Sequence, residues 1–318
     1  MLTLEKLYHA QSVLDGVIRR TEILSAPTLC PGVDLFLKPE NLQITGSFKI
    51  RGAYYKISLL SDEERERGVI ACSAGNHAQG VALAATKSNI KSTICLPISA
   101  PRAKVNPTIA YGAEVVLVDG VYDDAYKQAM LLQNEYRYTL IHPFDDEDVI
   151  AGQGTVALEM LNQISDVDAI VLPVGGGGLA SGCAYAIKSI NPHIKIYGVQ
   201  SSKIPSMLNS IRANKILEMP SASTIADGIS VKKPGRIAFD LCNHYLDDIV
   251  TVTDEEICAA VLVLLERCKL LTEGAGAISL AAVMFGKINL LNKRVVCLVS
   301  GGNIDMETLS KIINNKEK

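Results

Sequence analysis

The amino-acid sequence predicts an α/β protein built on parallel sheets. Short apolar, β-branched runs alternate along the 318 residues with longer segments whose apolar residues recur at helical spacing. Hydrophobic residues make up 48% of the chain and charged residues only 20%, which is enough to bury a sizeable core. No uncharged apolar run reaches the ~18 residues that a membrane-spanning helix needs. We therefore expect a soluble globular chain of about two domains.

Seven apolar runs are predicted as strands because they are short and rich in β-branched residues. They are residues 68–72, 92–96, 114–118, 169–174, 195–199, 248–252 and 294–299. Residues 121–136 and 254–268 have the apolar spacing of connecting helices. Strands that alternate with helices favour parallel sheets with helices on both faces. The charged segment 59–68 predicts either a solvated helix or a boundary between two lobes.

Composition excludes several classes of partner. The chain has 31 basic and 34 acidic residues, a formal net charge of -3, and so no electrostatic footprint for nucleic acid or a membrane surface. Its eight cysteines form no CxxC pair and lie mostly in apolar runs, which is typical of buried thiols in a reducing compartment. The first residues lack the apolar core of a signal peptide. We expect a cytoplasmic location and a small neutral or zwitterionic partner.

The strongest local signal is the segment 169–190, where an apolar strand leads through four consecutive glycines, 175–178, into an apolar helix. Glycines at such a junction let backbone N–H groups, with the helix dipole behind them, bind an anion. A tight turn without a ligand needs one or two glycines rather than four. The segment therefore predicts a phosphate site.

A dinucleotide is one candidate for this phosphate, because Gly175, Gly177 and Ala180 fit the pattern G-x-G-x-x-[G/A]. A dinucleotide site also needs an acidic residue at the end of the next strand, where this chain has Gln200. The Walker pattern fails as well, since no Lys-Ser or Lys-Thr follows the glycines. The sequence favours a compact phosphate without a ribose. A nicotinamide-dependent oxidoreductase or a non-catalytic nucleotide sensor is the rival hypothesis.

Two other glycine-containing loops follow predicted strands, CSAGNHAQG at 72–80 and SGGNID at 300–305. Ligands of parallel α/β folds collect at the carboxyl ends of strands, so the three loops can converge on one crevice. Taken alone, the loop at 72–80 is equally consistent with an ordinary Ser or Asn helix cap. His77 alone is more often a cap or a packing residue than a base.

Lys49 stands in the predicted first turn of a helix, beside an apolar stripe formed by Ile50, Ala53, Tyr54 and Ile57. Cations usually avoid this end of a helix, where the dipole is positive. A lysine held there and partly desolvated has a lowered pKa and an amine suited to Schiff-base formation. On its own Lys49 is equally consistent with a surface charge. Together with a phosphate site it suggests pyridoxal phosphate, which needs both.

Six motifs occur in order across nearly the whole chain: PENLQITGSFKIRGA, CSAGNHAQGVA, PVGGGGLASG, ADGISVKKPG, TEGAGA and SGGNID. Together they closely resemble the threonine dehydratases (threonine ammonia-lyases) of the fold type II pyridoxal phosphate enzymes, and most closely the short catabolic form. The resemblance implies a two-lobed α/β fold like that of tryptophan synthase β, with the cofactor between the lobes. Residues 1–67 and 146–318 would form the large lobe, and residues 68–145 the small lobe.

The resemblance also implies how the cofactor is bound. Lys49 would carry it as a Schiff base, with Phe48 packing near its ring. Asn76 would hydrogen-bond the ring hydroxyl, and Ser300 would face the pyridine nitrogen. The neutral Ser300 hydroxyl leaves that nitrogen largely unprotonated, which favours loss of a β leaving group over transamination. The cofactor phosphate would be bound by the backbone N–H groups of Gly175, Gly176, Gly177, Gly178 and Leu179.

A second set of residues is implied for the substrate. Its carboxylate would be bound by the loop formed by Ser73, Ala74, Gly75, Asn76 and His77. Glu273 and Asp227 are plausible neighbours of the site, without an assigned role. The implied reaction is a β-elimination that converts L-threonine to 2-oxobutanoate and ammonium, and L-serine to pyruvate. The freed amine of Lys49 would remove the α proton, and the β-hydroxyl would leave as water.

A serine racemase or a serine-preferring dehydratase is the alternative within the same family. Related racemases carry a second serine where this chain has Ala74, and a methyl group cannot transfer a proton. Racemases also bind a divalent cation through acidic side chains after the next strand. Here that stretch offers Gln200, Ile204 and Ser206, so we expect dehydration to dominate and no divalent metal at this position. A monovalent ion stays open.

The family resemblance bears on assembly and control as well. It implies a homodimer or homotetramer, and AMP or CMP as a candidate effector. Biosynthetic relatives carry C-terminal regulatory domains for feedback inhibition, whereas this sequence ends at Lys318. Isoleucine control is therefore not expected in it.

Overall fold

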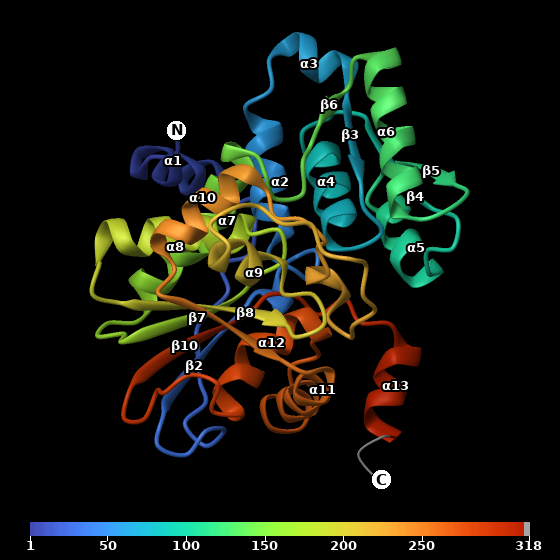
Figure 1. Cartoon of the computed structure of the whole chain (residues 1–318). Helices are drawn as coiled ribbons and strands as arrows, with labels where there is room; N and C mark the ends of the chain where they lie inside the picture. Colours follow the sequence, from blue (N-terminus) through green and yellow to red (C-terminus); the bar gives the residue numbers. More distant parts are fainter. Residues whose placement is uncertain (315–318) are drawn as a thin grey trace.

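Two sheets form the framework of the molecule (Figure 1). The computed structural model describes residues 1–314. The larger sheet has the strand order β1-β2-β10-β7-β8-β9, and within it β1 pairs antiparallel with β2 while the other pairings are parallel. Its strands are β1 (Leu24–Ser25), β2 (Asp34–Pro39), β7 (Ala169–Pro173), β8 (Lys195–Ser201), β9 (Asp248–Val252) and β10 (Arg294–Val299).

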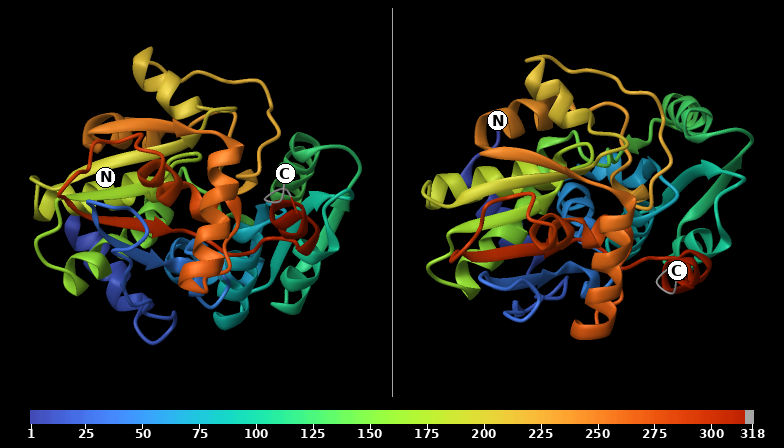
Figure 2. Two further views of the ribbon diagram at one scale, coloured as in Figure 1. Left: turned by 90° about the horizontal axis from the view of Figure 1, so that it is seen from below. Right: turned by 60° about the horizontal axis from the view of Figure 1, so that its bottom comes forward.

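The smaller sheet is parallel throughout and has the order β5-β4-β3-β6. Its strands are β3 (Val69–Cys72), β4 (Ser92–Pro97), β5 (Glu114–Val118) and β6 (Thr139–Leu140). All four come from one continuous stretch of chain between β2 and β7. The two sheets and their helices lie side by side in the views of Figure 2. The predicted lobe boundaries, at residues 67/68 and 145/146, stay a prediction.

All seven predicted strands are present, with ends within two residues of the predicted ones. Three further strands were not predicted. β1 and β6 have two residues each, too few for a recognisable pattern. β2 has the sequence DLFLKP, in which Asp34 and Lys38 interrupt the apolar run, although Lys38 is fully buried.

Helices cover both sheets. They are α1 (Leu4–Leu14), α2 (Lys49–Ser58), α3 (Asp62–Arg67), α4 (Asn76–Lys87), α5 (Arg102–Ala110), α6 (Tyr122–Tyr136), α7 (Glu147–Gln163), α8 (Gly178–Ile190), α9 (Ser206–Arg212), α10 (Arg236–Tyr245), α11 (Asp254–Val263), α12 (Gly274–Met284) and α13 (Met306–Asn314). The turns η1 (Glu40–Leu42) and η2 (Asp227–Ile229) are 3-10 helical, and η3 (Leu264–Cys268) is π-helical. No helix of residues 1–314 is long and apolar enough to cross a membrane.

Both helices predicted from apolar spacing are confirmed, and the second changes to π-helical geometry in its last turn. The charged segment 59–68 forms α3, which has no buried residue and is closed at its start by a capping box between Ser61 and Glu64. Residues 62–67 therefore form a solvated helix, and the alternative of a boundary between two lobes is not tested by this observation.

The core of the larger sheet is divided by the alternation of its strands. Val296 and Leu298 of β10 pack on the face covered by α1, α7, α8 and α10, whereas Val295, Cys297 and Val299 pack on the face covered by α11 and α12. Successive side chains of a strand point to opposite faces, so a six-residue strand serves two cores. The sheet is thus buried on both faces, as its continuous apolar strands predict.

Helix α2 lies between α4 and α7 at backbone contact. A Cβ on Gly152 of α7 would lie 2.6 Å from the Cα of Gly52 in α2, and a Cβ on Gly80 of α4 would lie 3.0 Å from the carbonyl carbon of Lys49. Since α2 begins at Lys49, these contacts with α4 and α7 fix the position of that residue relative to the two sheets.

We predict that Gly152→Ala lowers the free energy of unfolding by about 1–3 kcal/mol, because the added methyl meets backbone atoms that cannot move aside. Urea denaturation followed by circular dichroism measures the change. Asn134→Ala on the exposed face of α6 is the control and should have little effect. Equal stability of Gly152→Ala and the natural chain would show that α2 and α7 separate freely.

Candidate active site

The predicted site residues line one cavity of about 970 Å³. The loops that follow β3, β7 and β10 converge on it, as the strand ends of a parallel fold predict. The structure brings together there all of the residues proposed from sequence: Phe48, Lys49, Ser73, Ala74, Gly75, Asn76, His77, Gly175, Gly176, Gly177, Gly178, Leu179 and Ser300. Their individual roles stay predictions.

Lys49 is the first residue of α2 and projects into the cavity wall. Its Nζ donates a hydrogen bond of 2.7 Å to the carbonyl oxygen of Pro143 and lies 5.3 Å from the centre of the Phe48 ring. Burial lowers the pKa of Lys49 to about 8, while the Glu273 carboxylate acts in the opposite direction. The lowered pKa predicted from sequence is confirmed, with burial as its main cause.

The turn that precedes Lys49 is tied to the loop after β10. The Phe48 N–H donates to the Ser300 carbonyl at 3.2 Å, and the Gly302 N–H donates to the Gly46 carbonyl at 2.9 Å. Ser47 forms an isolated antiparallel bridge with Gly301. These bonds tie the turn before Lys49 to Ser300, which is buried and lines the same cavity.

The glycine run forms a cradle with no room for side chains. A Cβ on Gly176 would lie 2.5 Å from the Phe144 ring, and a Cβ on Gly178 would lie 2.6 Å from the Phe144 carbonyl oxygen. Gly177 has φ +101°, which favours glycine. The N-terminus of α8, which follows, has no side-chain cap, so its first N–H groups are available to an anion. The cradle, the buried amine of Lys49 and the Ser300 hydroxyl fit pyridoxal phosphate.

The loop at 73–77 leads into α4 without the Ser or Asn cap that sequence left open. The N-cap of α4 is Gly75, with no side-chain hydrogen bond, while Ser73 Oγ accepts from the Gly75 N–H at 3.2 Å. The His77 Nε2–H donates to the Ile141 carbonyl at 2.8 Å. Burial, and then the charge of Lys49, lower the pKa of His77 to about 3. His77 is therefore a neutral packing residue, and the uncapped helix end is available to an anion.

Sequence reasoning missed the segment 142–145, because no motif distinguishes it. The Phe144 and Asp145 N–H groups donate to Nδ1 of His142, which closes a turn that presents the Pro143 carbonyl to Lys49. The Asp145 carboxylate accepts from three N–H groups at the start of α10. Asp145 thus anchors the turn to α10, whose preceding Gly235 N–H donates to the Gly176 carbonyl.

The two candidate neighbours named from sequence also line the cavity. Glu273 accepts from Asn76 Nδ2 at 2.6 Å, and burial, followed by the charge of Asp227, raises the pKa of Glu273 to about 7. Asp227 pairs with Lys104 of α5 across the cavity. A second ion pair of 2.7 Å joins Lys232 to Asp123 of α6. Both pairs connect the helices of the smaller sheet to the segment that contains η2.

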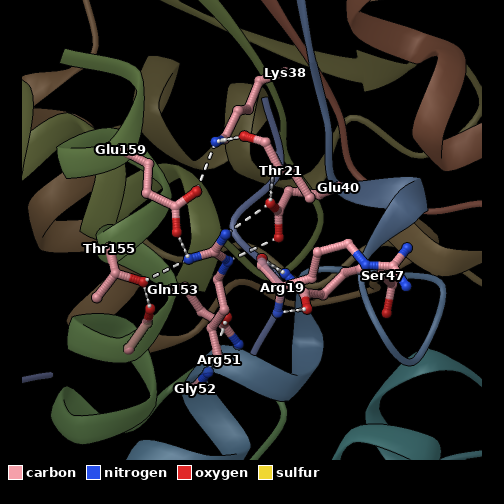
Figure 3. Close-up of polar contacts among 12 residues, drawn as sticks. Arg19, Thr21, Lys38, Glu40, Ser47, Arg51, Gly52, Gln153, Thr155 and Glu159 are labelled. Atoms are coloured by element: carbon pink, nitrogen blue, oxygen red, sulfur yellow. Dashed lines mark hydrogen bonds and ion pairs between the residues drawn. The ribbon is translucent and has the colours of Figure 1, made fainter. Parts of the chain in front are cut away.

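A buried ionic network holds α2 against the larger sheet (Figure 3). Arg51 donates to both carboxylate oxygens of Glu40, at 2.7 and 2.8 Å, and to Glu159 at 2.7 Å. Lys38 donates to Glu159 at 2.6 Å and to the Thr21 carbonyl at 2.5 Å. Burial favours a neutral Glu40, but Arg51 and Lys38 outweigh it and keep the pKa of Glu40 below its usual value. Two cations and two carboxylates thus neutralise one another inside the fold.

The stretch at and after the end of β8, where we expect no divalent metal, makes internal hydrogen bonds. Gln200 Oε1 accepts from the Leu208 N–H at 2.9 Å, and Ser206 Oγ donates to the Val231 carbonyl at 2.6 Å. Residues 1–314 contain no group of three or more His, Cys, Asp or Glu side chains that could hold a metal ion.

The fold and the site are those of an α/β enzyme whose cavity combines a buried lysine with a glycine cradle, a combination that fits a phosphate-bearing aldehyde cofactor. The chain belongs to the family of pyridoxal-phosphate dependent enzymes, whose family model matches residues 14–301. Pyridoxal phosphate is therefore its cofactor.

Similar proteins include lyases of known name. An L-threonine ammonia-lyase of Thermotoga maritima is 49% identical over 99% of this chain and 79% of that protein. The catabolic L-threonine dehydratase TdcB of Staphylococcus aureus is 44% identical over 99% of this chain and 93% of its own. Among solved structures, maize serine racemase has a TM-score of 0.93 at 35% identity, with 99% of this chain and 98% of that chain covered. Threonine deaminase isoform 2 of Solanum lycopersicum has a TM-score of 0.91 at 36% identity, with 98% of this chain and 93% of that chain covered.

We predict that Arg51→Met lowers the free energy of unfolding by about 3–5 kcal/mol, because it leaves Glu40 buried without its main partner. The double variant Arg51→Met with Glu40→Leu should recover much of that loss, since it removes both members of a buried pair. Denaturant unfolding of the cofactor-loaded protein measures both. A double variant no more stable than Arg51→Met would contradict this account.

The lowered pKa of Lys49 predicts how its amine reacts with an aldehyde. In cofactor-free protein, attachment of pyridoxal phosphate to Lys49 should rise with pH and reach half its maximal rate near pH 8. An ordinary lysine of pKa ~10.4 has roughly a hundredfold less neutral amine at that pH. Borohydride trapping and mass spectrometry of the Lys49 peptide give the rate. The urea-unfolded chain is the control, and a Lys49 profile that matches it would contradict the prediction.

Proposed function

We propose that the chain is a threonine ammonia-lyase, which converts L-threonine to 2-oxobutanoate and ammonium and also converts L-serine to pyruvate. The observation that carries the proposal is the Lys49 amine of pKa about 8, held in one cavity with the glycine cradle of residues 175–178. The names of the 44–49% identical relatives support the same substrate.

The bound cofactor supplies an electron sink that makes the α carbon of an attached amino acid acidic. In our proposal the N–H groups of residues 175–179 bind its phosphate, Asn76 donates to its ring oxygen, and Ser300 faces its ring nitrogen. The uncapped N-terminus of α4 binds the substrate carboxylate. Phe48 packs near the ring, as its contact with the Lys49 amine suggests.

Lys49 is the proposed base. Its neutral amine, populated because burial lowers its pKa, takes the α proton of the substrate, and the carbonyl of Pro143 stabilises the ammonium that results. The β-hydroxyl leaves as water with one proton, and this proton balances the one that Lys49 removes from the α carbon. Hydrolysis of the released enamine consumes one water, so the net products are the 2-oxo acid and ammonium.

Serine racemisation is the second candidate, and the similarity to maize serine racemase is the observation that favours it. A racemase needs a proton carrier on the face opposite the lysine. In this chain Ala74 lines the cavity where the related racemases have a serine, and burial raises the pKa of the nearby Tyr122 phenol far above its ordinary value. We therefore propose that racemisation is minor.

Several finer proposals rest on the family resemblance alone. They are assembly as a homodimer or homotetramer, a response to AMP or CMP, and the division into a small lobe of residues 68–145 and a large lobe of the remainder. A cytoplasmic location is a further proposal, which rests on the composition and cysteine usage of the sequence.

The proposed function predicts that the purified protein is yellow and releases 2-oxobutanoate from L-threonine. Lys49→Ala should lose the near-violet absorption and more than ~99% of the rate, since it removes both the attachment point and the base. Absorbance and 2-oxo acid release from threonine and serine, with and without AMP or CMP, measure this. Asn134→Ala, on the exposed face of α6 and outside the cavity lining, is the control.

Two outcomes would sink the proposal. Abundant D-serine after incubation with L-serine, detected by chiral chromatography, would establish the racemase instead. A colourless protein that binds a dinucleotide would establish the oxidoreductase or sensor.

A further inference from the structure

The side-chain amide of Asn76 lies in a row of three polar residues, of which the other two have no proposed contact with the cofactor. Asn303 Nδ2 donates to Asn76 Oδ1 at 2.7 Å, and Asn76 Nδ2 donates to Glu273 Oε1 at 2.6 Å. All three residues line the cavity. The row joins the loop after β10, the first residue of α4 and the residue that precedes α12.

The direction of this row is set at one end by the backbone. Asn303 Nδ2 also donates to the Thr45 carbonyl at 2.8 Å. A carbonyl only accepts, so Asn303 must turn its nitrogen toward Thr45, and both hydrogens of that nitrogen are then used. Asn303 therefore donates a hydrogen bond to Asn76, so the side-chain oxygen of Asn76 must face Asn303 and accept it.

The other end of the row agrees with this direction. An ionised Glu273 only accepts, so it takes a hydrogen from Asn76 Nδ2. Asn76 is left with one N–H that no protein group uses among the bonds described. A ligand in the cavity thus meets a donor at Asn76, whereas an inverted amide would present an oxygen.

Two glycines leave room for the row. A Cβ on Gly46 would lie 2.5 Å from Asn303 Oδ1, and a Cβ on Gly301 would lie 2.5 Å from Glu273 Oε1 and 3.1 Å from Asn76 Nδ2. Gly46 belongs to the turn that also carries Thr45 and that precedes Lys49. The space that the amide row needs thus accounts for Gly301, and it adds to the positive φ of +71° that favours glycine at position 46.

We propose that Asn303 is a positioning residue: anchored on the Thr45 carbonyl, it fixes the orientation of the Asn76 amide so that an N–H faces the cofactor. The inference rests on the proposed contact of Asn76 with the cofactor ring oxygen. It adds a residue beyond that contact and a cause for the orientation of the amide.

Asn303→Asp tests the inference, because the introduced carboxylate accepts a hydrogen bond where Asn303 donates one. The Asn76 amide then inverts and presents its oxygen to the oxygen of the cofactor ring. We expect the dissociation constant of pyridoxal phosphate to rise on the order of tenfold and the visible absorption maximum to shift. Asn243→Asp, on the exposed face of α10, adds the same charge away from the cavity and should change neither quantity.

A double variant separates orientation from stability. With Glu273→Gln added to Asn303→Asp, the new amide donates to the oxygen of the inverted Asn76. The melting temperature of the cofactor-free protein should recover in part, while cofactor affinity and spectrum stay altered. Recovery of affinity together with stability would overturn the inference, because Asn303 would then serve the fold alone.

The remaining outcomes are equally decisive. A natural dissociation constant and spectrum in Asn303→Asp would overturn the role of Asn303. If Asn76→Ala also binds the cofactor normally, the proposed contact of Asn76 fails and the inference fails with it. If Asn76→Ala binds weakly while Asn303→Asp does not, only the positioning role fails.

Discussion

The position of α2 depends on four charged side chains that the fold buries. Arg51, Glu40, Lys38 and Glu159 link α2 to β2, η1 and α7, and Arg51 and Glu40 are fully buried. Apolar residues of the same volume would often be as stable as a buried ion pair. We infer that the network fixes the position of α2 rather than adding stability. A bidentate Arg–carboxylate pair tolerates little displacement, so α2 can take only one position along the sheet. Because Lys49 lies two residues before Arg51 in the same helix, its position is fixed as well.

Backbone contacts complete this constraint. Gly52 meets α7 and Gly80 meets the start of α2, so neither neighbouring helix can approach or slide without a clash. The loop after β10 closes the third side through the bonds of Phe48 and Gly302. The flexible side chain of Lys49 therefore starts from a fixed backbone position, and its amine has a defined hydrogen-bond acceptor in the Pro143 carbonyl. Rigid surroundings of this kind hold a reacting group close to productive geometry.

Local pattern was sufficient to predict much of the fold and of the cavity wall. Apolar runs such as 294–299 predict strands wherever they occur, and the glycines at 175–178 predict a phosphate site because they lie between a strand and a helix. Lys49 is ambiguous by itself and is assigned a role only together with that distant glycine run and the family resemblance. Buried charges carry no such signal. Arg51 pairs with Glu40 and with Glu159, 108 residues away, and each reads as a surface charge until the fold brings them together. For the same reason β2 was not predicted, because Lys38 looked like a surface charge within it. The proposed role of Asn303 depends on Thr45, which is 258 residues away in the sequence.

The fold by itself does not choose between elimination and racemisation, because a serine racemase and a threonine deaminase match it almost equally well. The choice depends on proton carriers in the cavity. His77 is held neutral with its Nε2–H engaged, and Ala74 has no proton to exchange. Two cavity groups have pKa values moved close to neutrality, Lys49 to about 8 and Glu273 to about 7, and their charges stabilise one another. In the proposed reaction, the proton that Lys49 takes from the substrate is held beside the Pro143 carbonyl and the Glu273 carboxylate, on the face from which it came. Because neither His77 nor Ala74 can deliver a proton to the opposite face, we expect loss of the β-hydroxyl rather than racemisation.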